Sequence, residues 1–217
     1  MYSENWGIFW TALNPTLGTG IFYNPASSFS DTNAFLAIQN IDKNPATQTG
    51  GQLTVSRRIY LEFIKLICTA SPAAAASMHA ALKIDPVLSR YSSGGTQLTR
   101  NSPVAESPAT PAATIFAGAI NLAAASGKAA VLDREVVRFA APKIGDEYLF
   151  SFGSDSKNVS EQLDTANVSK FTSIMTPVIQ AWQSTLTLHL WFPSATIGSS
   201  SSSGGPSFEV VVGWRER

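Results

Sequence analysis

The sequence predicts an all-β protein, folded as an antiparallel β-sandwich of about eight short strands. Apolar and polar residues alternate with period two in several short segments, as they do in strands that bury one face. Gly, Pro, Asn and Ser separate these segments and favour turns. Charged residues make up only 14% of the 217 positions, whereas roughly a quarter is usual in soluble domains. A surface with so little charge favours association, so we expect the protein to assemble with other chains, with a neutral monomer as the alternative.

Residues 1–33 differ from the rest because their aromatic side chains follow no sustained period. Five of them are Trp6, Phe9, Trp10, Phe22 and Tyr23. Such a segment cannot bury its own apolar surface, so these side chains need a host, either the chain's own sandwich or a neighbouring subunit. We therefore predict an extended aromatic N-terminal arm, 1–33, and a sandwich domain, 34–217. The five aromatic residues are our candidates for contacts between proteins.

Alternation places the strands of the sandwich in chain order. The predicted segments are 34–41, 59–68, 114–122, 134–141, 146–152, 185–192 and 207–214. The last two are the clearest, because four apolar residues share one face of each. These are Leu186, Leu188, Leu190 and Phe192 in the first segment, and Phe208, Val210, Val212 and Trp214 in the second. The Ser/Gly-rich stretches 92–95 and 199–205 are predicted loops.

The stretch 72–83 is compatible with two structures. Ser71 and Pro72, followed by four alanines, are typical of the start of a helix. Met78, Ala80 and Leu82 instead alternate with their neighbours as in a strand. We favour the strand, because the surrounding segments are strands. The polar segment 158–171 is irregular and compatible with a helical turn.

Residues that could form a metal or nucleophilic site are sparse. His79 and His189 both fall on the polar face of predicted strands, where we expect them at the surface, and without a nearby Cys or carboxylate cluster a zinc site is not predicted. The single cysteine, Cys68, lies in an apolar run and is expected to be a buried hydrophobic residue. The sequence contains no Gly-x-Ser-x-Gly elbow, P-loop ending or calcium loop.

One pair of carboxylates, Asp133 and Glu135, could share a strand face at a separation of about 7 Å, which is compatible with a glycosidase pair. Arg134 and Arg138 surround them, so we interpret the group as cross-strand ion pairing. The sequence therefore predicts a non-enzymatic protein with no catalytic residue, cofactor or metal.

The charge pattern and the apolar runs bear on partners and location. Lys and Arg number 15, as do Asp and Glu, and neither sign forms a block, so no nucleic-acid partner is predicted. No apolar run approaches the roughly 18 residues of a transmembrane helix, and the N-terminus lacks the pattern of a signal peptide. We expect synthesis in a cytoplasm and no membrane partner.

Several segments together resemble structural proteins of tailed phages. They are 57–67, 90–96, 144–148, 188–193 and 206–209. The resemblance covers roughly residues 34–217, outside the arm, and points to proteins similar to capsid decoration, or cement, proteins, which commonly form jelly-roll trimers. It implies a jelly roll for the sandwich, a homotrimer, the major capsid protein as partner, and the virion as location.

The leading hypothesis is a virion structural protein that binds and stabilises the phage head as a capsid decoration protein. Trp6, Phe9 and Trp10 would staple neighbouring subunits, because each buried aromatic side chain contributes about 2 kcal/mol. One alternative is a virion protein of the neck, tail or fibre. Another is a carbohydrate-binding module that stacks sugars on Trp182, Trp191 or Trp214, although Trp214 lies on a predicted core face. A hydrolase is the least favoured alternative.

Overall fold

The computed structural model describes most of the chain. The described residues are 7–24, 26–42, 47–49, 52–54, 57–73, 77–87, 89–102, 110–152, 168–173, 177–179, 184–193 and 204–217. Within these ranges every regular element is a β-strand, so the predicted all-β class is confirmed.

The strands have these bounds: β1 Ile8–Leu13, β2 Ile21–Phe22, β3 Asn33–Asn40, β4 Thr47–Thr49, β5 Gln52–Thr54, β6 Ile59–Ala70, β7 Met78–Asp85, β8 Tyr91–Gln97, β9 Thr99–Asn101, β10 Ala113–Leu122, β11 Ala130–Arg138, β12 Glu147–Phe152, β13 Val168–Ser173, β14 Val178–Ile179, β15 Thr185–Trp191 and β16 Ser207–Glu216.

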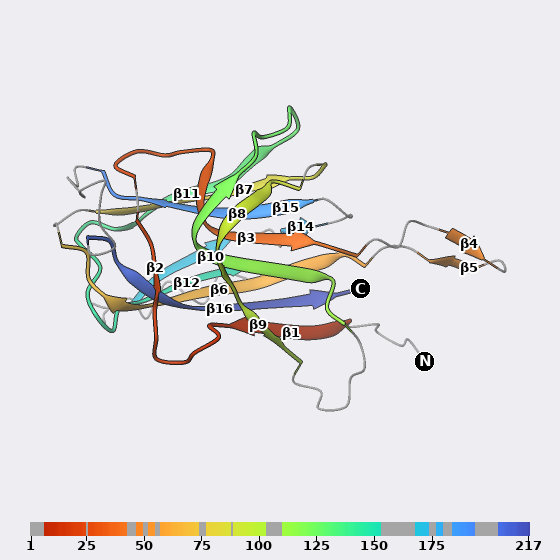
Figure 1. The fold of residues 1–217 in the computed structure, drawn as a ribbon, viewed down its shortest axis with the longest axis horizontal. Helices are drawn as coiled ribbons and strands as arrows, with labels where there is room; N and C mark the ends of the chain where they lie inside the picture. The colour runs from red at the N-terminus through yellow and green to blue at the C-terminus, as the bar shows by residue number, and fades with distance from the viewer. Residues whose placement is uncertain are drawn as a thin grey trace.

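Most of these strands form two sheets that pack against each other as a sandwich (Figure 1). The first, which we call the β16 sheet, has the order β13-β12-β6-β16-β1-β9, with β14 paired to β6 and β2 paired to β16. The second, the β15 sheet, has the order β11-β7-β15-β3-β10-β8. β4 and β5 form a separate hairpin. Pairing is antiparallel throughout the described strands except between β12 and β13.

Eight of the strands pair in a nested order. β1 pairs with β16, β3 with β15, β6 with β12, and β7 with β11. In chain order, the first of the eight strands pairs with the last, the second with the seventh, the third with the sixth and the fourth with the fifth. The eight strands thus form one long antiparallel ribbon that is folded back on itself. Rolling that ribbon puts alternate pairs into the two sheets, which is the jelly-roll arrangement. β8, β9 and β10 form an insertion that widens both sheets at one edge.

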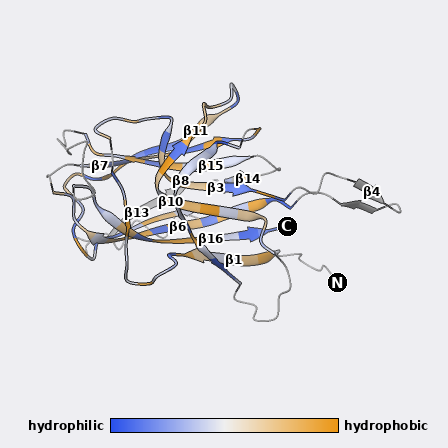
Figure 2. Cartoon of the chain, in the orientation of Figure 1, coloured by the Kyte–Doolittle hydropathy of each residue, from blue (hydrophilic) through white to orange (hydrophobic). Residues whose placement is uncertain are grey.

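The core lies between the sheets and is built by the predicted apolar faces. The alternating residues Leu186, Leu188, Leu190, Phe192, Phe208, Val210, Val212 and Trp214 are all buried. Figure 2 shows the same alternation as hydrophobic and hydrophilic residues that succeed one another along the strands. The indole Nε1 of Trp214 donates to Glu216 Oε1 at 2.9 Å, which satisfies its polar atom inside the core.

The outer face of the β15 sheet is covered by residues 26–32, which we call the strap. The Phe29 ring centroid lies 5.0 Å from that of His189 and 5.7 Å from that of Trp191. His189 Nδ1 lies 3.0 Å from the Ser30 carbonyl oxygen and 2.8 Å from the Asn33 carbonyl oxygen. His189 is therefore 1% exposed, and the prediction of a surface histidine is wrong. His79, in contrast, is half-buried.

Part of the predicted N-terminal arm belongs to the sandwich. Residues 8–13 form β1, which lies between β16 and β9 and pairs with both. Ile21 and Phe22 pair with the first residues of β16. For these residues the host is therefore the chain's own sheet, because their backbone groups find hydrogen-bond partners there.

Two segments predicted to be irregular contain strands. Residues 92–95 lie within β8, where Gly94 and Gly95 have positive φ values and the register with β10 shifts. Of 158–171, the described residues 168–171 belong to β13, and 158–167 lie outside the described residues. The strand favoured for the end of 72–83 is confirmed as β7, and residues 74–76 lie outside the description. The predicted loop 199–205 is described only at its last two residues.

Candidate interaction surface

Of the five aromatic residues predicted to contact other proteins, two lie in the core. Trp10 and Tyr23 are each 4% exposed. The Tyr23 hydroxyl donates to the Leu190 carbonyl at 2.8 Å, and burial raises the pKa of that hydroxyl. These two side chains stabilise the sandwich and offer little surface to a partner.

The other three aromatic residues are placed differently from one another. Phe9 is half-buried and pairs in register with Arg215, near the start of β1 and the end of β16. Phe22 is half-buried and lines a pocket. Trp6 lies outside the described residues. The structure thus does not gather the four described aromatic residues into one surface.

Two of the three most exposed large apolar side chains among the described residues lie in the connection between β11 and β12, residues 139–146, which we call the β11–β12 turn; the third is Leu17, 73% exposed in the loop after β1. Phe139 is 88% exposed and Ile144 is 72% exposed. Large apolar side chains that are exposed to solvent in one turn are candidates for a protein interaction site. The sequence prediction missed them because it continued the strand to residue 141 and so placed Phe139 in a sheet.

A buried carboxylate fixes the shape of this turn. Asp146 is 2% exposed, and its Oδ2 accepts hydrogen bonds from the Lys143 backbone N–H at 2.7 Å and the Tyr148 hydroxyl at 3.1 Å. The same oxygen pairs with Arg138 Nη1. Backbone hydrogen bonds to both sides of Cys68 join the turn to β6. The two exposed apolar side chains are therefore held by an ordered backbone, which lowers the entropy cost of docking.

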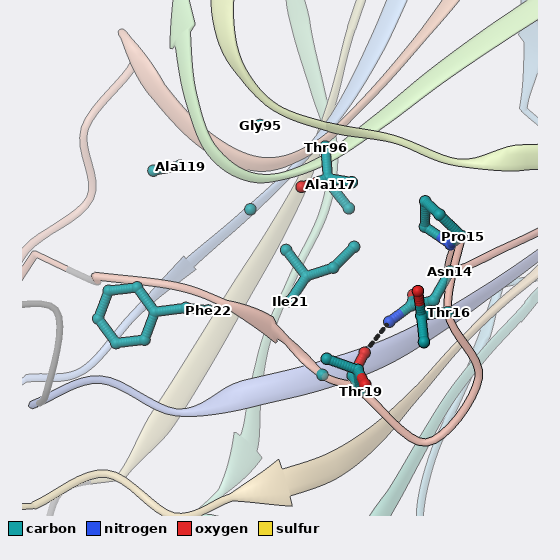
Figure 3. Close-up of a pocket in the computed structure, with 12 residues that line it drawn as sticks. Asn14, Pro15, Thr16, Thr19, Ile21, Phe22, Gly95, Thr96, Ala117 and Ala119 are labelled. Atoms are coloured by element: carbon teal, nitrogen blue, oxygen red, sulfur yellow. Dashed lines mark hydrogen bonds between the residues drawn. The ribbon is translucent and has the colours of Figure 1, made fainter.

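A pocket of about 450 Å³ opens beside β2 (Figure 3). Ile21 and Thr96 lie on opposite sides of it, Pro15 lies toward one end and Phe22 toward the other. None of the 12 residues that line it is ionisable. The pocket is thus a neutral hollow with both methyl and hydroxyl groups.

Local backbone geometry keeps the pocket open. Gly118, in the bulge of β10, has a φ of 108°, and a Cβ there would lie 2.8 Å from Ile21 Cγ2. On the opposite wall, the Asn14 side chain donates to the Thr19 carbonyl at 2.8 Å and accepts from the Val210 N–H at 2.8 Å. The loop 14–20 is therefore tied to β16.

The residues that the sequence offered as candidates for catalysis do not form a catalytic group in the described structure. Arg138 pairs with Asp146 instead of the expected Glu135 or Asp133. Glu135 Oε2 is buried without a hydrogen bond, and burial, with a smaller contribution from Asp133, raises the pKa of Glu135 to about 6. Burial also raises the pKa of the Cys68 thiol to about 11, which opposes thiolate formation.

Of the three tryptophans considered for sugar stacking, the two in the described part of the chain are buried. Trp191 and Trp214 are 6% and 1% exposed, and Trp182 lies outside the described residues. In the part of the chain that is described, no three His, Cys, Asp or Glu side chains gather as metal ligands. Among the same residues no helix is long and apolar enough to cross a membrane.

Comparison of the chain with protein-family models, with curated proteins and with solved structures found no match. The functional argument therefore depends on the fold and on the two surface features, the β11–β12 turn and the β2 pocket.

Proposed function

We propose that the chain is a virion structural protein, a capsid decoration protein that attaches to the head of a phage-like particle as a self-associated unit. The observation that carries the proposal is the β11–β12 turn, which presents Phe139 and Ile144 to solvent from an anchored backbone. Burial of both side chains against another protein would contribute roughly 3–6 kcal/mol. Between neighbouring copies on a shell, a contact of this size, repeated many times, would help to hold a decoration layer in place.

The strand order supports the same proposal. Jelly rolls are used by viral capsid proteins, lectins and cupins, and the fold alone does not choose among them. Trp191 and Trp214, the two described tryptophans considered for sugar stacking, are buried, which disfavours the carbohydrate-binding alternative. The low charge of the chain, 14% of its residues, also suits a subunit that covers its surface with other subunits.

The proposal is tested on virions purified from the host in which this gene is expressed, by quantitative mass spectrometry against the major capsid protein. We expect the chain in the particle at a copy number comparable to that of the capsid protein. A few copies per particle would instead assign it to the neck, tail or fibre. Absence from purified particles would contradict the proposal.

A second measurement tests stabilisation of the head. Heads prepared without the chain should release their genome at a lower temperature than decorated heads, and addition of purified protein should restore the difference. Equal release temperatures would show that the chain does not act as a cement.

A further inference from the structure

We propose that copies of this chain associate head to tail, with the β11–β12 turn of one copy seated in the β2 pocket of the next. The inference deepens the proposed function, on which it rests, because it names the contact that would hold the decoration unit together. Its occupant is a second copy of this chain.

The two features lie at opposite edges of the sandwich. The turn joins β11, the edge strand of the β15 sheet, to β12, which lies next to the edge of the β16 sheet. The pocket adjoins β8, the other edge strand of the β15 sheet, and the loop that follows β1. A projection and a hollow on opposite edges of one chain make a heterologous contact, which closes into a ring when the rotation between copies allows it.

The two surfaces are chemically complementary, because one is a neutral pocket and the other presents an apolar side chain. The pocket is lined by neutral residues, so an apolar side chain can enter it without the desolvation of a charge. Phe139, the most exposed of the large apolar residues described, supplies such a side chain. Ile21 and Phe22 are half-buried at the pocket and would provide apolar contacts for the ring.

Charged groups beside the two surfaces are complementary. Lys143 is exposed in the turn next to Ile144. Glu209 lies beside the loop 14–20, where its Oε1 accepts a hydrogen bond from the Gly18 N–H. A cation beside the projection and an anion beside the hollow would favour this register over a contact between two identical edges.

The first experiment measures self-association by sedimentation velocity over a range of concentrations. Phe139→Ser removes the projection, and Ala119→Trp fills the pocket from its exposed mouth. We expect each variant to weaken self-association roughly 100-fold, as the loss of a buried aromatic anchor does. Val131→Ser is the matched control, because Val131 is 55% exposed on β11, the strand that leads into the turn, and lies near the opposite end of that strand.

The second experiment mixes the two variants. Phe139→Ser chains keep an open pocket and Ala119→Trp chains keep the projection, so a head-to-tail contact allows one heterodimer that cannot extend or close. We expect a heterodimer in the mixture and none from the doubly substituted chain. A pair of identical contacting patches would not give this result.

Three outcomes would overturn the inference: a wild-type chain that stays monomeric, an oligomer that both variants leave unchanged, or a mixture without heterodimer. Far-ultraviolet circular dichroism checks that Ala119→Trp folds, and Thr96→Trp, also at the exposed mouth, replaces it if it does not. Failure here leaves the copy number in virions unaffected, so the inference and the proposed function can fail separately.

Discussion

The polar side chains on the outer faces of the two sheets lie in opposite environments. Thr187 and His189, on the β15 sheet beneath the strap, are each 1% exposed. Lys65 and Glu147, on the β16 sheet, form a 2.9 Å ion pair with side chains 32% and 42% exposed. The comparison shows that the polar residues of an alternating strand can lie in two environments. They are exposed to solvent, or they are buried beneath another segment of the chain that supplies polar partners.

The covered face satisfies its polar groups almost entirely within the chain. Arg90 is 1% exposed, its Nε donates to the Ala123 carbonyl at 3.2 Å, and its Nη1 lies 3.3 Å from Asp31 Oδ1. Lys83 pairs with the same carboxylate. Because the side chains of Arg90 and Lys83 are only 1% and 13% exposed, these two cations depend on their partners more than the exposed pair of the β16 sheet does, although Asp31 stays 37% exposed.

Arg90→Met should have the largest effect on stability. It leaves the Ala123 carbonyl and the Asp31 backbone carbonyl without their donor, so we expect the free energy of unfolding to fall by about 3 kcal/mol. Urea unfolding measures the loss. Lys65→Met is the matched control on the open face, with an expected loss below about 1 kcal/mol. Equal losses for the two variants would contradict the distinction between the faces.

His189 should make the covered face sensitive to acid. Burial is the main reason that the pKa of His189 lies at about 4, below its ordinary 6.5. The folded state thus favours the neutral ring, so its stability is full above about pH 6.5 and falls by about 3 kcal/mol as the pH drops toward 4. Unfolding measured against pH should show a shallower fall in His189→Gln. An unchanged slope would mean that the pKa of His189 is the same in the folded and unfolded states, which would contradict the lowered pKa.

Phe29→Ser should open the strap. Phe29 is 41% exposed and covers His189 and Trp191, so we expect a loss of about 1–2 kcal/mol together with faster amide hydrogen exchange in β15. Phe139→Ser serves as the control, because a side chain 88% exposed contributes little to the stability of the monomer. Unchanged exchange in β15 would show that the strap does not protect this strand.

Glu135→Gln should give the smallest change and the opposite sign. The pKa of Glu135 is raised to about 6 from 4.5, so the wild-type chain loses stability as the pH rises between these values. The variant removes that loss, and after allowance for solvent screening of a half-buried group we expect a gain of about 1 kcal/mol at neutral pH. The gain should disappear at pH 4, where Glu135 carries its proton. A gain that persists there would indicate a different cause.

Local patterns predicted the strands that bury one face. Alternation located β3, β15 and β16 closely, and a long run that is apolar on both faces located β6. β1 was missed because it is a strand through its pairing with β16, which is distant in sequence, and the residues around β1 show no alternation that would indicate this pairing. β8 was missed because its Ser and Gly residues are typical of loops.

The candidate surface was harder to predict than the fold. His189 has a polar neighbour, Thr187, two positions away, and this pattern predicts a face exposed to solvent. The face is buried because the strap, which is distant in sequence, covers it. The exposure of Phe139 depends on where β11 ends, which is set by contacts of Asp146 with the turn and of the turn with Cys68. The burial of His189 and the exposure of Phe139 both depend on contacts between residues distant in sequence, and the periodicity of a local segment does not predict such contacts.

The pairing of β1 with β16 also has a consequence during synthesis. Ile8 pairs in register with Glu216, so β1 must wait for β16 to leave the ribosome, after all the strands between them have been made. Contacts between such distant residues slow folding, and they leave apolar segments unpaired in the meantime. We therefore expect a nascent chain that depends on chaperones, and a yield of folded protein that rises when translation and folding proceed at low temperature.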